Sequence, residues 1–108
     1  MMRAVYALSI ARLLLNKLSR DHSKRIVENY VSMNIISRED AENVIKFLEM
    51  LPEGEKKKAE TLEYNDHVKL MILCAYMSGN VDFVKELSYH KSIADIVLTK
   101  SVEKTIGF

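Results

Sequence analysis

Residues 70–77, Leu-Met-Ile-Leu-Cys-Ala-Tyr-Met, are the stretch that decides the fold. This unbroken apolar run would place apolar side chains on every side of a helix, and such a helix is normally buried all round. Asn65 or Asp66 offers a cap at the start of the helix, and Gly79 ends it. In a chain of 108 residues we therefore expect this helix to be the centre of a single core.

The scarcity of turn-forming residues favours a helical fold. The chain has three glycines and one proline, whereas an all-β sandwich or a phosphate-cradling loop needs many more. Its 48% apolar and 29% charged residues are ordinary for a globular protein. The sequence therefore predicts an all-α fold, a single compact bundle of five to six helices built from helical hairpins. We expect one domain over residues 1–108, with an exposed charged loop at about 52–64.

Apolar residues recur at helical spacing in five further segments. The expected helices are residues 2–19, 22–33, 38–51, 81–89 and 93–105. The last segment is rich in β-branched residues at 96–99, so both helix and strand remain open for it.

Local signals mark the ends of two of these helices. Ser37 is a good N-cap, and Asp40 three residues later completes a short version of the capping box. Asp21 or Ser23 offers a cap for the second helix, and Asn34 can take the left-handed conformation that ends it. These signals fit helices joined by short loops.

The charges are unevenly distributed along the chain. Residues 1–26 carry six basic side chains and one acidic one, whereas residues 27–63 carry nine acidic and five basic ones. The two segments can complement each other inside the fold, or the basic segment can face an acidic partner. The sequence leaves both interpretations open.

The expected first helix has more apolar surface than a small surface helix needs. Its alanines permit a close approach by a neighbouring helix, and we expect that side to pack on the central helix. Large exposed apolar surfaces usually mark interfaces. We therefore expect the rest of the helix to contact another protein or a second copy of the chain through Tyr6, Ile10, Leu13 and Leu14. The alternative is that neighbouring helices of the same chain enclose it.

The basic residues near the N-terminus are candidates for a charged contact. Arg12, Asn16 and Arg20 step by four and so share one face of a helix. Positioned cations of this kind suit phosphate groups or an acidic partner. We expect the contact to consist of Arg12, Lys17, Arg20, Lys24 and Arg25. The alternative is a solvated face, which is also the expectation for the lysine cluster at residues 56–58.

No residue pattern points to catalysis or to metal binding. The histidines, His22, His67 and His90, do not have the short spacing of zinc ligands. Cys74 lies within the apolar run, whereas a reactive thiol needs an electropositive and partly exposed setting. The sequence has no Gly-rich phosphate loop and no nucleophile-elbow motif. We therefore expect a protein that is not an enzyme and that has no metal and no cofactor.

The second and third expected helices have a connection of the length found in helix-turn-helix proteins. The acidic residues of the third helix would face the phosphates of DNA and oppose binding. These residues are Glu39, Asp40, Glu42 and Glu49. An ordinary helical hairpin is therefore the preferred interpretation.

Together these patterns favour a small helical accessory or adaptor subunit that acts by protein–protein contacts, with a nucleic-acid-handling complex as one setting. The alternative is a DNA- or RNA-binding regulatory or architectural protein that uses its basic N-terminal face. A single cysteine fits a reducing compartment, so we expect a cytoplasmic location. The apolar runs are shorter than a membrane span, so we expect no membrane partner. An Arg-rich, acid-free start is also typical of an organelle presequence.

Overall fold

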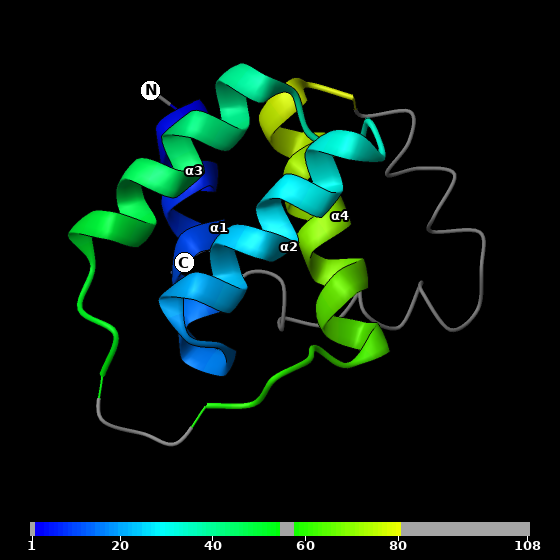
Figure 1. Ribbon diagram of the computed structural model, residues 1–108. Helices are drawn as coiled ribbons and strands as arrows, with labels where there is room; N and C mark the ends of the chain where they lie inside the picture. The colour runs from blue at the N-terminus through cyan, green and yellow to red at the C-terminus, as the bar shows by residue number, and fades with distance from the viewer. Residues whose placement is uncertain (1, 55–57, 81–108) are drawn as a thin grey trace.

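The computed structural model describes residues 2–54 and 58–80, which form four helices (Figure 1). They are α1 (Met2–Lys17), α2 (Arg20–Ser32), α3 (Arg38–Met50) and α4 (Tyr64–Ser78). Between these described residues the only β-type pairing is a single bridge from Leu18 to Ala59. The prediction of a compact all-α fold is confirmed. The helices expected at 81–89 and 93–105, and with them the number of five to six helices, lie outside the described residues.

The helix at the centre of the described bundle is α1. It packs against α3, α4 and α2. Its buried residues span more than one side of the helix and are Ala7, Ser9, Ile10, Ala11, Leu13, Leu14 and Leu15. Within the described residues, α1 rather than the helix of residues 70–77 contacts all three other helices. The apolar run is still buried over most of its surface, with Leu70, Ile72 and Leu73 each at most 1% exposed.

Contacts between the helices fix their relative directions. Arg3 Nε, near the start of α1, lies 3.1 Å from Asp40 Oδ1 near the start of α3, so these two helices run in parallel. The ring of Tyr6 stacks on that of Tyr76 with centroids 5.8 Å apart, which joins the start of α1 to the end of α4. Consequently α4 runs antiparallel to α1, as Figure 1 shows.

The α1–α2 connection has the two-residue length that the sequence predicts, but it lies two residues earlier in the chain. Ser19 is the N-cap of α2, and its hydroxyl accepts a hydrogen bond from the backbone N–H of His22 at 3.3 Å. The predicted caps, Asp21 and Ser23, are therefore wrong. Ser23 is instead buried, and its hydroxyl donates to the carbonyl of Ser19 at 2.7 Å. Only two residues separate the helices, which brings the start of α2 close to the end of α1.

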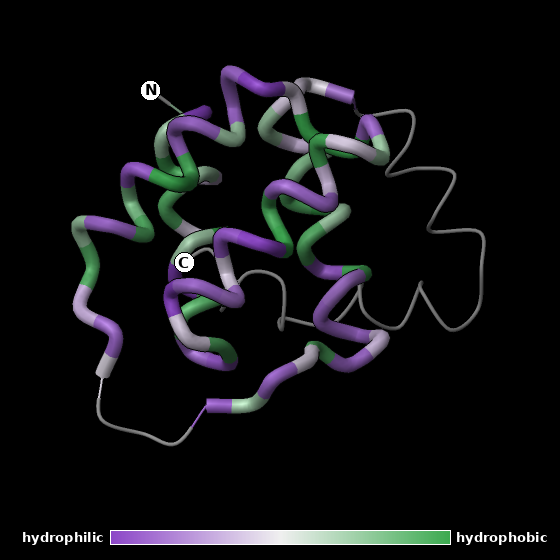
Figure 2. The backbone as a smooth tube through the Cα atoms, viewed as in Figure 1, coloured by the Kyte–Doolittle hydropathy of each residue, from purple (hydrophilic) through white to green (hydrophobic). Residues whose placement is uncertain are grey.

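The turn between α2 and α3 follows the predicted local signals. Asn34 has a φ of 60°, and the hydroxyl of Ser37 accepts from the backbone N–H of Asp40 at 3.1 Å. The carboxylate of Asp40 does not complete a capping box as predicted, because it is buried and faces Arg3 instead. Polar and apolar segments alternate along α3 in Figure 2, as expected of a helix with one buried face.

Residues close in sequence mark both ends of α4. Glu63 is its N-cap residue, and the backbone N–H of Glu63 donates to Asp66 Oδ2 at 3.2 Å. The predicted caps at Asn65 and Asp66 are thus two to three residues late. Gly79, with a φ of 78°, ends the helix as predicted. None of the four described helices is long and apolar enough to cross a membrane.

The segment between α3 and α4 is held against α1. Lys58 Nζ donates to the carbonyl of Leu15 at 2.6 Å, and the backbone N–H of Ala59 donates to the carbonyl of Lys17 at 3.0 Å. Lys58 therefore caps the last turn of α1 and is not simply solvated, contrary to the expectation for the lysine cluster. The other two lysines of that cluster lie outside the described residues.

Candidate functional site

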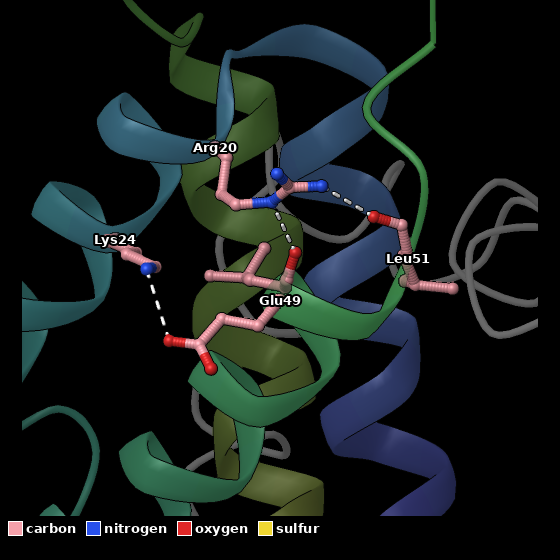
Figure 3. A network of polar contacts seen from close by, with 5 residues as sticks. Arg20, Lys24, Glu49 and Leu51 are labelled. Carbon is pink, nitrogen blue, oxygen red and sulfur yellow. Dashed lines mark hydrogen bonds and ion pairs between the residues drawn. The ribbon is translucent and has the colours of Figure 1, made fainter.

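Arg20, predicted as a contact residue, is used by the fold itself. Its Nε donates to the carbonyl of Leu48 and its Nη2 to that of Leu51, both at 2.8 Å (Figure 3). Carbonyls at the end of a helix have no partner within the helix, and a positive charge there suits the helix dipole. Arg20 is therefore the C-terminal cap of α3.

Beside this contact, the side chain of Glu53 caps the start of α2. The backbone N–H of Arg20 donates to Glu53 Oε1 at 2.8 Å. This N–H belongs to the first turn of α2 and has no acceptor within its own helix. Arg20 and Glu53 thus join the start of α2 to the end of α3, over a separation of 33 residues.

Two further basic side chains of residues 1–26 are paired within the fold. Lys24 Nζ lies 3.2 Å from Glu49 Oε1 on α3, and this partly exposed pair is visible in Figure 3. Arg3 Nε lies 3.1 Å from the buried Asp40 carboxylate. Together with Arg20, these pairs show that part of the charge asymmetry is complemented inside the fold. Arg20 and Lys24 of the predicted contact set thus have partners within the fold.

The remaining predicted cations, Arg12, Lys17 and Arg25, are exposed. Within residues 2–54 and 58–80 none of the three has a side-chain ion pair or hydrogen bond. A guanidinium or ammonium group in this state keeps its full capacity to bind an anionic group. The structure thus divides the basic residues into a structural group and an available group.

The apolar residues predicted as a partner surface lie largely in the core. Ile10, Leu13 and Leu14 are 2%, 7% and 0% exposed. Tyr6 is half-buried and stacks on Tyr76. Because α1 is enclosed by the other three helices, these side chains pack within the chain, and their predicted outward placement is corrected.

Next to Arg12 the surface forms a shallow hollow of about 150 Å³. It lies between the last turns of α1 and the residues that follow α3. Its lining residues are Arg12, Leu15, Asn16, Leu51 and Pro52. The hollow therefore combines an apolar floor with two exposed polar side chains of α1. Sequence reasoning identified Arg12 and missed the floor, whose position depends on how α3 packs on α1.

Of the four acidic residues expected on the outer face of α3, three are exposed and Asp40 is buried. Asp40 is 2% exposed and paired with Arg3, and Glu49 pairs with Lys24. Glu39 and Glu42 remain exposed. The outer face of α3 is therefore less acidic than its sequence suggests.

The interior holds a small group of titratable side chains. Burial raises the pKa of the Cys74 thiol to about 12, and the Asp40 carboxylate adds to the shift. Tyr30 is hydrogen-bonded to His67 Nδ1 at 2.7 Å, and burial raises the pKa of its hydroxyl, with a smaller contribution from Cys74. At neutral pH the thiol and the phenol are both protonated and neither is activated as a nucleophile. No cluster of His, Cys, Asp and Glu suited to a metal occurs in the described part of the chain.

Comparison with protein-family models, with curated proteins and with solved structures finds no match. The exposed cations and the hollow beside Arg12 are the surface features of the described residues that could bind a partner.

Proposed function

We propose that this chain is a non-enzymatic helical accessory or adaptor subunit that binds an acidic partner protein through its first two helices. The observation that carries the proposal is the exposure of Arg12, Lys17 and Arg25, which have no side-chain partner among residues 2–54 and 58–80. Other cations of the same segment are satisfied by carbonyls and carboxylates of α3. Arg12, Lys17 and Arg25 are thus the basic side chains of this segment that form no polar contact with the described residues and can bind a partner.

The state of the interior groups supports a binding role over a catalytic one. Cys74, the chain's single thiol, has a pKa of about 12, far from that of an activated cysteine nucleophile. The hydroxyl of Tyr30 is buried and hydrogen-bonded to His67. These groups stabilise the contact between α2 and α4, and they offer no general base or nucleophile in an open cleft.

Direct binding of DNA or RNA is the competing proposal. With five cations on phosphates, the logarithm of affinity would fall with the logarithm of salt concentration with a slope near −4 to −5. Arg20 and Lys24 are engaged within the fold, so the three remaining cations give a slope near −3. Three cations on phosphates give only weak affinity for DNA or RNA at physiological salt. This favours a protein as the partner.

The test is co-purification of the tagged full-length chain from its own host after mild cross-linking. The wild type is compared with Arg12→Gln/Lys17→Gln/Arg25→Gln, and Glu39→Gln/Glu42→Gln is a control with altered charge elsewhere. We expect a protein partner that is retained by the control and lost with the triple variant, while circular dichroism shows unchanged helicity. A partner retained by the triple variant, or one released by nuclease, would overturn the proposal.

A further inference from the structure

The hollow beside Arg12 has a chemical composition that selects among ligands. Leu15, Leu51 and Pro52 supply its apolar surface, and Arg12 and Asn16 supply exposed polar groups one helical turn apart. Its volume of about 150 Å³ is close to that of an apolar cavity known to hold benzene. A hollow of this volume has room for one apolar side chain.

The backbone around the hollow offers little to a ligand. The N–H of Leu51 donates to the carbonyl of Phe47 at 2.9 Å, and the carbonyl of Leu51 accepts from Arg20. Pro52 has no N–H to donate. A ligand must consequently be recognised by the side chains of Arg12 and Asn16 and by apolar contact.

We infer that this hollow receives a short acidic segment of the partner protein, with one apolar side chain in the hollow and an adjacent carboxylate on Arg12. This inference rests on the proposed function. Charge complementarity carries it, because Arg12 has no acidic partner in the described residues and its planar guanidinium can bind a carboxylate through two parallel hydrogen bonds. The amide of Asn16 adds a donor on the same face of α1.

The surroundings favour a carboxylate over a nucleic-acid backbone. Glu49 lies in the last turn of α3, and Glu53 directly follows Pro52 of the hollow. Their negative charges oppose every anion, but they oppose a row of several phosphates more strongly than a single carboxylate. The apolar floor adds nothing to phosphate binding, which depends on the number of phosphates neutralised by cations. One carboxylate with a neighbouring apolar side chain uses every part of the hollow.

The test uses the full ¹⁵N-labelled chain and follows backbone amide shifts during titration with N-acetyl-leucyl-aspartate. We expect saturable shifts at residues 12–16 and 51 with a Kd on the order of 1 mM. Arg12→Gln should weaken binding roughly two- to fivefold, as for an exposed ion pair. Arg38→Gln, which removes the same charge at the start of α3, at the opposite end of that helix from the hollow, should leave the Kd unchanged.

Three results would overturn the inference. With both dipeptides used as C-terminal amides, they are equal shifts from the then neutral N-acetyl-leucyl-asparagine, an absence of shifts at residues 12–16, and stronger shifts from a ten-nucleotide dT probe weakened equally by Arg12→Gln and Arg25→Gln. If the dipeptide fails while a protein partner still co-purifies in a manner that depends on the three exposed cations, the acidic segment is rejected and the adaptor function stands.

Discussion

Replacing Arg20 with methionine tests how this protein uses its basic residues. Methionine keeps an unbranched apolar stem and a good helix propensity, so the change removes the guanidinium with little other disturbance. The variant loses the two hydrogen bonds to the carbonyls of Leu48 and Leu51. Those carbonyls are left at the end of α3 without a protein partner.

The size of the effect follows from this geometry. A hydrogen bond to a charged group contributes about 1.5–3 kcal/mol when it is desolvated, and at a half-buried site water replaces part of the lost donor, so each of these bonds contributes about 1 kcal/mol. We expect the two bonds together to contribute about 2 kcal/mol to the free energy of unfolding. For a domain of this size that corresponds to a fall in Tm of roughly 10 °C. Arg20→Lys keeps the charge and one donor position, so it should recover about half of the loss.

Urea denaturation followed by circular dichroism measures the change. Arg12→Met is the matched control, because it removes the same group from an exposed position on α1 that has no side-chain partner in the described part of the chain. Its expected effect is within about 0.5 kcal/mol of the wild type. A loss below about 0.5 kcal/mol for Arg20→Met, or an equal loss for Arg12→Met, would refute the division into structural and available cations.

Three further predictions concern the core, a turn and the interior titratable groups. Leu14→Ala should lower the free energy of unfolding by about 2–5 kcal/mol, because Leu14 is buried in the core. Met50→Ala, at an exposed position, should lower it by less than about 0.5 kcal/mol. Similar urea midpoints for the two variants would place Leu14 outside the core. Asn34→Val should cost about 1–2 kcal/mol by the same assay, because φ is 60° there, whereas Asn34→Gly should be tolerated; no difference between them would contradict the left-handed turn. The native Cys74 thiol should react with a disulfide reagent at pH 8 about 1000-fold more slowly than the urea-unfolded chain, because its pKa rises from 9.0 to about 12. Since the folded pKa values of Cys74 and Tyr30 are raised, their contribution to stability is complete below pH 9. It falls by up to about 1.4 kcal/mol per pH unit and group above that, as the unfolded chain releases protons that the native state keeps. In Cys74→Ala the decline should begin near pH 10, the ordinary pKa of Tyr30, and a decline still beginning at pH 9 would show that Cys74 does not cause it.

Features set by neighbouring residues were predictable from the sequence. Ser37, Asn34 and Gly79 act through hydrogen bonds or backbone angles within three or four residues, so the local pattern contains the cause. The caps of α2 and α4 were misplaced because several adjacent Ser, Asp and Asn residues have the same capping chemistry. Ser19 and Glu63 are selected by where the chain enters each helix.

Features set by tertiary packing were not predictable in this way. α1 and α4 are both strongly apolar, and which of them is enclosed depends on how α2 and α3 pack. Arg20 was assigned to a partner surface because its acceptors are backbone carbonyls 28 and 31 residues away. Backbone carbonyls have no sequence signature. The set of basic residues could therefore be predicted, but the sequence could not show which of them bond within the fold and which stay available to a partner.

The side-chain Nε–H groups of the arginines give the most direct test of that division. In ¹⁵N-resolved spectra at neutral pH, hydrogen exchange at Nε reports whether the group is held in a hydrogen bond. We predict a slowly exchanging signal for Arg20, identified by its loss in Arg20→Lys, and fast exchange for Arg12 and Arg25. Exchange at Arg20 as fast as at Arg12 would contradict the account, because Arg20 would then be as available to a partner as the other two.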